Sequence, residues 1–479
     1  MRNTMAALIT CAGCLLLTIA SARAADDAAR ANVVLITVDT LRADRLGAYG
    51  HRSDTTPALD RLAAGGVRFA DVTAQWPQTW PCIASMMTST YPSTTGVRYS
   101  PRRPLALKHR TLAEILSAAG YQTGAVVANA TIGKRLGFDQ GFDTFVESWA
   151  AGSGQSAARR LEKDPGRIKE LTNATTVTDQ GLRVLKSFDS RRPFFVWLHY
   201  IDPHGPYVPP PVYAEMFANS YAPEPVDHRL LPAYQQQKAG NASVISDLAF
   251  YKAQYDREVR YFDDQVARVL AVLAADSNNE RTLIVITADH GEGLGEHRYY
   301  LEHGAVPYQP TAQVPLLMSM AGTLPAGRVV AEPVGLIDLA PTILDTIGIA
   351  PPPDMEGRSL LRLVRGEPDT APTHVFMESG RKHLSQVAVR RGPWKLVHTR
   401  AAADRHRFGL PELGLFNLRT DPGETNNLVN EHRELIAEMK GVLDTWVANG
   451  QKKMQASAPE VPETDSATKE ALRVLGYGG

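Results

Sequence analysis

Four apolar segments constrain the fold of this chain more than any other feature of its sequence. They are mainly apolar, rich in Val, Ile and Phe, and show no regular alternation with polar residues; they span residues 32–40, 123–129, 193–202 and 282–290. Continuous runs of this length are typical of strands buried on both faces of a mainly parallel sheet. Helix-like stretches lie between them, at residues 56–66, 111–120 and 253–275. This alternation predicts an α/β fold with a doubly wound, mainly parallel sheet and helices on both faces.

Polar residues follow three of these segments at the point where each predicted strand ends. Asp39 closes the first segment, Asp202 closes the third, and Asp289 and His290 close the fourth. An isolated Asp after a strand is often only a helix cap, but open α/β sheets bind ligands at the carboxyl ends of their strands. Because three strands share the feature, we expect one common site. His199, by contrast, is expected to face a neighbouring strand as a core histidine.

Two groups of side chains have the chemistry of cation ligands. Asp39, Asp289 and His290 offer carboxylate and imidazole donors, which suit a divalent ion such as Zn, Mn, Ca or Mg. The second group consists of Asp202, His204 and His303. This second group could hold another ion or could contact an anionic oxygen of a substrate directly. The sequence therefore predicts one or two divalent ions and leaves their number and identity open.

The first 24 residues have the layout of a secretory signal peptide. A basic residue at position 2 precedes an apolar stretch at residues 5–20, and a small-residue pattern at residues 22–24 precedes a polar segment. We expect cleavage after Ala24, export to the periplasm or the medium, and no stable membrane span after cleavage. An uncleaved N-terminal anchor is the alternative. Cleavage would leave Cys82 as the remaining cysteine, so no intramolecular disulfide is expected.

The charges of the chain are balanced, with 51 Lys and Arg residues against 51 Asp and Glu residues. No global field therefore attracts nucleic acid, and nucleic acid is not an expected partner. An anionic substrate must instead be recognised by local groups. The sequence does not indicate an oligomeric state.

A change of composition near residue 367 predicts two domains. We expect a catalytic domain at residues 30–366 and, after a linker, a small C-terminal α+β domain at residues 374–479. Within the second domain, short strands are expected in residues 388–399 and 413–424, followed by a helix over residues 425–448 and a polar, mobile tail.

The segment QWPQTWPCIASMMTSTYP, residues 75–92, offers several nucleophiles within a few positions. Thr79 and Ser85 supply hydroxyls and Cys82 supplies a thiol. A hydroxyl next to a bound cation can become a competent nucleophile at neutral pH. Composition alone does not choose among the three side chains.

Seven motifs resemble those of one known family. In chain order they are VVLITVDTLRADRLGAYG, TWPCIASMMTSTYPSTTGV, LGFDQGFDTF, PFFVWLHYIDPHGPY, TADHGEGLGEH, GLIDLAPTILDTIGI and LGLFNLRTDPGETNNL. On these motifs the chain is similar to the sulfatases of the alkaline phosphatase superfamily, over nearly its whole predicted mature length. The resemblance implies an alkaline phosphatase-like fold and metal-dependent hydrolysis of ester bonds.

The same resemblance implies a choice of nucleophile. Family sulfatases carry C-x-P-S-R followed by T-G, and the cysteine of this motif is oxidised to formylglycine. Here the proline of the motif falls on Pro81 and the later threonine on Thr88, which puts Thr79 in the nucleophile's place. A register with Cys82 as nucleophile would put Ala84 at the proline and fits worse. Because threonine cannot mature to formylglycine, none is expected, and Cys82 is expected to be a packed residue.

Several other positions depart from the family pattern. The arginine of the nucleophile motif is Ile83, the second of the paired acidic ligands is Thr40, and the asparagine after the later Asp is His290. The lysines that contact sulfate in the family are replaced by Asn129 and His303. These departures resemble the threonine-nucleophile, two-metal sites of phosphodiesterases and phosphoryl transferases in the superfamily. The residues expected to bind substrate are His204, Asn129 and Thr40.

Three functions follow from this comparison of motifs. The favoured one is a hydrolase that acts on a phosphoester, as a monoesterase, a phosphodiesterase or a phosphoryl transferase, through a covalent threonyl ester. The second is a sulfuric ester hydrolase, and the third is an inactive family member that binds carbohydrate or lipid. The expected substrate is an anionic ester of a small molecule, a glycan or a lipid head group.

Overall fold

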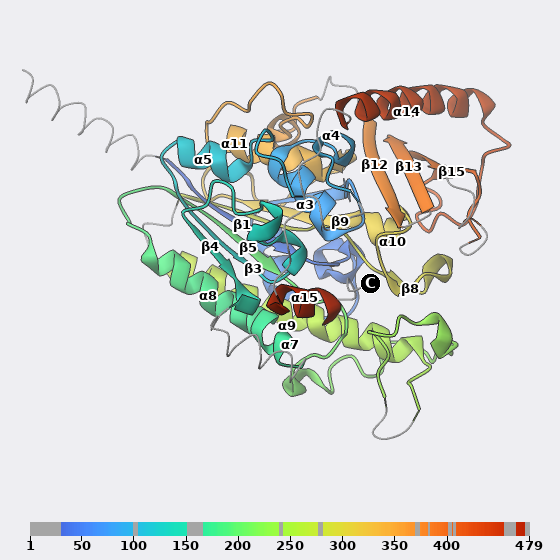
Figure 1. The fold of residues 1–479 in the computed structure, drawn as a ribbon, viewed down its shortest axis with the longest axis horizontal. Coiled ribbons are helices and arrows are strands. Elements are labelled where there is room, and N and C mark those ends of the chain that lie inside the picture. Colours follow the sequence, from blue (N-terminus) through green and yellow to red (C-terminus); the bar gives the residue numbers. More distant parts are fainter. Residues whose placement is uncertain are drawn as a thin grey trace, which may run out of the picture.

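The computed structural model describes most of the chain (Figure 1). The described residues are 30–98, 104–150, 166–238, 243–275, 281–368, 374–381, 384–400, 405, 409–454 and 466–474. The predicted signal peptide lies outside them, as do most of the predicted linker and most of the predicted mobile tail. No helix in the described part of the chain is both long and apolar enough to cross a bilayer.

A large sheet forms the centre of the molecule. Its strands are β1 (Asn32–Val38), β2 (Val67–Thr73), β3 (Gln122–Val127), β4 (Thr144–Glu147), β5 (Phe194–Tyr200), β6 (Thr282–Ala288), β9 (Gln313–Ser319), β10 (Arg328–Val330) and β11 (Val334–Gly335). The order across the sheet is β10-β2-β9-β6-β1-β5-β3-β4, and β11 pairs with β2. Strand β9 is antiparallel to β2 and β6, and the other pairings are parallel. The predicted fold class is therefore confirmed.

The four apolar segments of the sequence become β1, β3, β5 and β6, and these strands are neighbours in the sheet. Every residue of β1, β3 and β5 is buried, and in β6 only one residue is partly exposed. Burial on both faces explains why these strands are apolar without alternation. Their carboxyl ends meet at one edge of the sheet.

Helices cover both faces of this sheet. The main ones are α2 (Pro57–Ala64), α3 (Thr79–Thr88), α5 (Leu112–Ala118), α8 (Ala174–Ser187), α9 (Leu248–Ala275) and α11 (Leu339–Thr346); shorter ones are α4 (Pro92–Thr95), α7 (Gly166–Thr172), α10 (Gln309–Ala312) and α12 (Leu361–Val364). Helices α3, α5 and α11 lie on one side of the sheet and α8 and α9 on the other (Figure 1). Helix α5 begins with a capping box, in which Thr111 and Glu114 each accept the other's backbone N–H.

A second sheet follows the large one in sequence. Its strands β12 (His374–Arg381), β13 (Leu384–Arg391), β14 (Trp394–Thr399) and β15 (Leu413–Asn417) are antiparallel and adjacent in that order. One face packs on α14 (Arg433–Met454) through a cluster that includes Val389, Leu396 and Met439. The opposite face packs, through Phe416, against Tyr308 of the large body. Both faces of this small sheet are thus buried.

The C-terminal part differs in detail from the sequence prediction. Residues 388–399 contain the end of β13, a turn at residues 392–393 and all of β14, rather than one strand. Strand β12 was not predicted, and helix α14 begins at Arg433 instead of near residue 425. The last described helix, α15 (Ser466–Val474), does not join the small sheet, because Ala471 and Leu472 belong to the core of the large body. Short-range patterns could not reveal that long-range return.

Candidate active site

The site lies where four neighbouring strands end. Strands β6, β1, β5 and β3 lie side by side, and their last residues are in register, with Val38 of β1 opposite Ala288 of β6 and Tyr200 of β5. The next residues along β1 and β6 are Asp39 and Asp289. Their backbones continue the ladder, since Asp39 N donates to the Tyr200 carbonyl at 2.9 Å and Asp289 N donates to the Val38 carbonyl at 3.2 Å. The register therefore brings together two carboxylates 250 residues apart in sequence.

Asp39, Asp289 and His290 form the candidate cation site. All three are completely buried, and one ligand atom from each lies within 4.8 Å of the others. Among the described residues this is the one group of three or more such side chains with that spacing. Three buried oxygens of this region have no hydrogen-bond partner: Asp39 Oδ1, Asp289 Oδ2 and Thr40 Oγ1. Buried carboxylate oxygens without a donor are costly, and a hard divalent cation fits them.

The two carboxylates differ in their ionisation. Burial disfavours the charge of Asp39, but the imidazoles around it, first that of His204, hold its pKa below the usual range. Burial, and next the charge of Asp39, raises the pKa of Asp289 well above the usual range. Two carboxylates this close cannot both ionise without a compensating positive charge. A bound divalent cation would supply that charge and allow both to ionise.

Thr40 holds an uncommon backbone conformation next to this pair. Its φ is 58°, in the left-handed region, which is unfavourable for a β-branched residue. Strain of this kind costs on the order of 1–3 kcal/mol and is often found at functional sites. In this conformation Thr40 N donates to Asp289 Oδ1 at 3.3 Å, and the Thr40 carbonyl accepts from Tyr255 Oη at 2.6 Å. The turn thereby orients Asp289.

Thr79 is the first residue of α3, and its hydroxyl lies beside the cation group. Oγ1 of Thr79 is 3.3 Å from Asp39 Oδ2 and 3.4 Å from His290 Nε2. The side chain is completely buried. The amino end of a helix carries a partial positive charge, which stabilises a negative charge that develops on this oxygen. Thr79 thus has the surroundings of an activated nucleophile.

Asn129, just after β3, contacts both Thr79 and Asp39. Its Oδ1 accepts hydrogen bonds from Thr131 N at 2.9 Å and Thr131 Oγ1 at 2.8 Å. The amide nitrogen must therefore face the site, where Nδ2 donates to Asp39 Oδ2 at 2.6 Å and to Thr79 Oγ1 at 3.3 Å. Asn129 thus supplies a neutral donor to the oxygen that would become negative during attack.

Three imidazoles line the site, and the neutral rings of two of them share one tautomer. Nδ1 of His290 bonds the Gly291 carbonyl at 2.9 Å, and Nδ1 of His204 bonds the Gly205 carbonyl at 2.8 Å. Because a carbonyl can only accept, Nδ1 carries the proton and Nε2 carries the lone pair. The His303 ring lies 4.6 Å from the His290 ring and 5.0 Å from the His204 ring, measured between centroids.

Glu292 orients His303 and was missed by the sequence analysis. Oε1 of Glu292 is 3.2 Å from His303 Nδ1, and Oε2 accepts from Tyr207 Oη at 3.1 Å. Glu292 is completely buried, and burial raises its pKa to about 7. The residue belongs to the motif TADHGEGLGEH, but nothing in the sequence shows that the chain folds back from the strands β7 (Gly293–Leu294) and β8 (Tyr300–Glu302) to bring His303 onto it.

His199 lies directly behind Asp39. Its Nδ1 is hydrogen-bonded to Thr37 Oγ1 at 2.8 Å, and its Nε2 is 3.8 Å from Asp39 Oδ2. The ring is completely buried in the sheet. His199 is therefore anchored in the core as the sequence suggested, yet it also adjoins a predicted ligand.

Asp202 was predicted to hold a second cation, or to contact an anionic oxygen, together with His204 and His303. Neither Asp202 nor His303 belongs to the cation group of Asp39, Asp289 and His290. Oδ2 of Asp202 accepts from Ala174 N, at the start of α8, at 2.6 Å, and its Oδ1 lies 3.8 Å from Lys169 Nζ. Lys169 also pairs with the buried Glu258 at 2.8 Å. Asp202 therefore already has a helix terminus and an ammonium group as counter-charges.

Cys82 has the properties of a packed residue. It is completely buried in the main hydrophobic core, one turn after Thr79 on α3. Burial raises the pKa of its thiol to about 12, so the reactive thiolate is disfavoured at neutral pH. Cys82 is a poor nucleophile in this position.

Two family models match this chain. The family model described as "Sulfatase" matches residues 31–349. A second, "N-sulphoglucosamine sulphohydrolase, C-terminal", matches residues 295–449, which span the end of the large body, the small sheet and part of α14.

Individual relatives cover most of the chain. It is 24% identical over 461 residues to an arylsulfatase of Clostridium perfringens, covering 86% of this chain and 93% of the relative. It is 27% identical over 485 residues to the multifunctional alkaline phosphatase superfamily protein PehA of Trinickia caryophylli, covering 84% and 92%. Its fold is similar to the crystal structure of the phosphonate monoester hydrolase of Agrobacterium radiobacter, with a TM-score of 0.68 at 23% identity over 88% of this chain and 96% of the other.

Proposed function

Because the chain belongs to the sulfatase family of ester hydrolases, we propose that it is a metal-dependent hydrolase of sulfate or phosphate esters with Thr79 as its nucleophile. The observation that supports this most directly is the position of Thr79 Oγ1, at the amino end of α3 and 3.3 Å from Asp39 Oδ2. The competing nucleophile, Cys82, is buried with a raised pKa.

The candidate cation ligands are Asp39, Asp289 and His290, with Thr40 Oγ1 as a further oxygen. A bound divalent ion would lower the pKa of the Thr79 hydroxyl and polarise the ester. The residues of the chain perform the rest of the reaction. Asn129 Nδ2 and the amino end of α3 stabilise the negative oxygen of Thr79, and Asp39 Oδ2 lies within reach of its proton.

Proton transfers complete the proposed cycle. Thr79 Oγ1 passes its proton to Asp39 Oδ2 and forms a bond to phosphorus or sulfur while the bond to the alcohol oxygen breaks. The alcohol oxygen takes a proton from Nε2 of His204 or His303, which acts in this step as an imidazolium and becomes the neutral ring. The two rings adjoin each other and present Nε2 toward the site. Water then attacks the threonyl ester, and the neutral imidazole accepts its proton and returns to the imidazolium form. The Thr79 oxygen leaves with the proton held by Asp39, which regenerates the threonine.

We favour a phosphoester as the substrate. Where the family pattern has lysines, this site has the neutral amide of Asn129 and the imidazole of His303. The relatives include PehA, described as a multifunctional alkaline phosphatase superfamily protein, as well as an arylsulfatase. The second candidate, a sulfuric ester hydrolase, is supported by the family match itself. A glycan or lipid head group could supply the alcohol of either ester.

The number of ions and the context of the enzyme are part of the same proposal. We favour one cation, because Asp202 already pairs with Lys169 and the start of α8. His204 and His303 then contact ester oxygens.

We also propose that a catalytic domain at residues 30–366 precedes a small domain from residue 374. Export after removal of residues 1–24, to the periplasm or the medium, remains part of the proposal.

The test compares two substitutions on one helix. Thr79→Ala should lower kcat/KM by several orders of magnitude, whereas Cys82→Ser should stay within about tenfold of wild type, since it removes no group from the covalent chemistry. Both variants are assayed against an aryl sulfate, a phosphate monoester and a phosphate diester. The opposite ranking, or formylglycine found at residue 82 by mass spectrometry, would reject the nucleophile. A preference for aryl sulfate over both phosphoesters would select the sulfatase alternative.

A further inference from the structure

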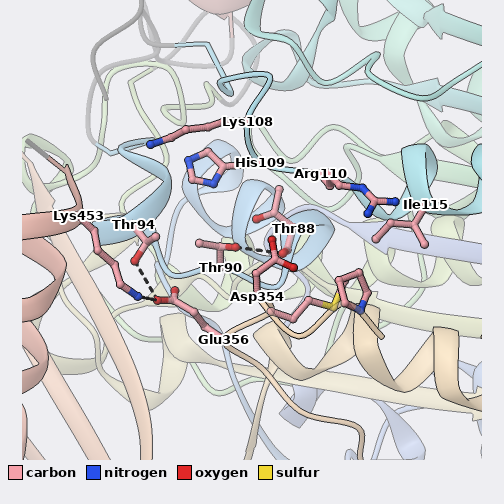
Figure 2. A pocket seen from close by; sticks show the side chains of 12 residues that line it. Thr88, Thr90, Thr94, Lys108, His109, Arg110, Ile115, Asp354, Glu356 and Lys453 are labelled. Atoms are coloured by element: carbon pink, nitrogen blue, oxygen red, sulfur yellow. Dashed lines mark hydrogen bonds and ion pairs between the residues drawn. The ribbon is translucent and has the colours of Figure 1, made fainter. Parts of the chain in front are cut away.

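A second pocket lies at the far end of the helix that begins with Thr79 (Figure 2). Its volume is about 200 Å³. It is lined by Thr88, Thr90, Thr94, Lys108, His109, Arg110, Ile115, Pro352, Asp354, Met355, Glu356 and Lys453. Helix α3 has ten residues between its two ends, which at a rise of 1.5 Å per residue is about 15 Å. The pocket is therefore separate from the candidate active site.

One wall of the pocket is fixed in place by Glu356. Its carboxylate accepts from Tyr91 N at 2.8 Å and from Thr94 Oγ1 at 3.1 Å, and pairs with Lys453 Nζ at 2.5 Å. Its backbone N–H donates to the Ser89 carbonyl at 2.7 Å. Segments distant in sequence are thus tied together around the cavity. A site built in this way needs little reorganisation to bind a ligand.

The threonines of the pocket can only accept further hydrogen bonds. Each hydroxyl has one proton, and all three protons are engaged within the protein. Thr88 donates to the Ala84 carbonyl at 2.7 Å, Thr90 donates to the Thr88 carbonyl at 3.0 Å, and Thr94 donates to Glu356. The free lone pairs of these oxygens therefore match a ligand that brings hydroxyl groups of its own.

The opposite side of the pocket has positive charge. Lys108 and His109 lie across the pocket from Glu356 and Lys453, as Figure 2 shows. Over its whole lining the pocket carries Lys108, Arg110 and Lys453 against Asp354 and Glu356, a net charge of one positive unit. In addition, the buried Nε2 of His109 has no hydrogen-bond partner. These groups match one anionic group on a ligand.

The apolar part of the lining consists of Ile115, Pro352 and Met355. Such side chains can cover the C–H face of a ring without satisfying any polar group. The volume corresponds to about seven water molecules at ~30 Å³ each, which suits one six-membered sugar ring better than a long chain. Hydroxyl donors, one anionic group and an apolar face occur together in an acidic sugar.

We propose that this pocket binds a single acidic sugar unit, apart from the ester on which Thr79 acts. The negative group of the sugar would lie toward Lys108, His109 and Arg110, and its hydroxyls would donate to the threonine oxygens. This assignment does not depend on whether the active site prefers phosphate or sulfate esters.

The test uses glucuronate as the probe, with glucose as a neutral sugar and inorganic sulfate as an anion without a ring. Binding to the full-length protein is measured by isothermal titration calorimetry and by saturation-transfer NMR. The charge-reversing variant Lys108→Glu/Arg110→Glu should weaken glucuronate binding at least tenfold. The control variant Arg365→Glu/Arg419→Glu changes the net charge equally, at exposed arginines outside the pocket, and should bind glucuronate like wild type.

Turnover of a small aryl ester should be the same in wild type and both variants, which shows that the pocket variant is folded. Three results would overturn the proposal: no binding of glucuronate by wild type, equal binding by the pocket variant and the control, or binding of glucose as strong as that of glucuronate. Inorganic sulfate could also bind as tightly as glucuronate and lose its affinity in the pocket variant. That result would show that the pocket binds a simple anion rather than an acidic sugar, and it would also refute the proposal.

Discussion

Lys395 and Glu424 form an ion pair that is closed off from solvent. Lys395 Nζ lies 2.8 Å from Glu424 Oε1, and both side chains are 0% exposed. Lys395 also donates to the Pro307 carbonyl, and Glu424 Oε2 accepts from Gln309 N at 2.5 Å. The pair therefore joins the small sheet to the segment that follows His303 in the large body.

We predict that breaking this pair destabilises the enzyme more than removing it. Glu424→Gln leaves the Lys395 ammonium buried without a counter-charge, which should lower the free energy of unfolding by about 3–5 kcal/mol. The double variant Lys395→Met/Glu424→Gln should recover much of this loss, because no buried charge remains. Urea denaturation of both single variants and the double variant gives the coupling energy. If the two single variants lose unfolding free energies that add up to the loss in the double variant, the pair does not act as a unit.

His303 should depend on Glu292 for its orientation. In Glu292 each carboxylate oxygen contacts one group, His303 Nδ1 or Tyr207 Oη. In Glu292→Gln one of these oxygens is replaced by an NH2 group, which cannot accept a hydrogen bond, so one of the two contacts is lost. We expect kcat to fall about 10–100-fold, the range found when a supporting hydrogen-bond partner of a site residue is lost, while the metal content stays as in wild type.

The matched control for this substitution is Glu332→Gln, an exposed residue outside the site, which should leave kcat unchanged. The pH profile separates positioning from simple loss of stability, because a misplaced His303 should shift the profile and a destabilised protein should not. An unchanged kcat in Glu292→Gln would mean that His303 does not need this partner.

The sequence predicted the parts of the site that depend on strand ends and motif register. Continuous apolar runs located the strands, so Asp39, Asp289 and His290 could be placed together before the fold was known. The resemblance of the nucleophile motif placed Thr79 in the same site. Glu292 could not be found in this way, because its role depends on a return of the chain at β7 and β8 rather than on any local pattern.

Removal of the cation should abolish activity, and rebinding should release protons. Burial, and next the charge of Asp39, raises the pKa of Asp289, so this carboxyl holds its proton to a higher pH than an ordinary aspartate when no cation is bound. A cation must displace that proton, so its affinity should increase as pH rises toward the pKa of Asp289.

Calorimetry in buffers of different ionisation enthalpy measures the protons released when a divalent ion is added to chelator-treated protein. Asp289→Asn has no such proton to release and should bind the ion weakly at every pH. Full activity in excess chelator would contradict the cation site itself. An affinity that is independent of pH in wild type would contradict the assigned ionisation of Asp289.

The final prediction concerns Asp202 and the number of cations. In the structure Asp202 accepts from Ala174 N and lies near Lys169, which also pairs with Glu258. Asp202→Asn should therefore leave the metal content at one ion per chain, as in wild type. Lys169→Met should lower the free energy of unfolding by about 3–5 kcal/mol, because two buried carboxylates lose their counter-charge. Metal analysis of both variants beside Asp289→Asn, which should lose its ion, provides the comparison. Two ions in the wild type and one in Asp202→Asn would instead make Asp202 a ligand of a second cation and would favour the two-metal arrangement for phosphoryl transfer.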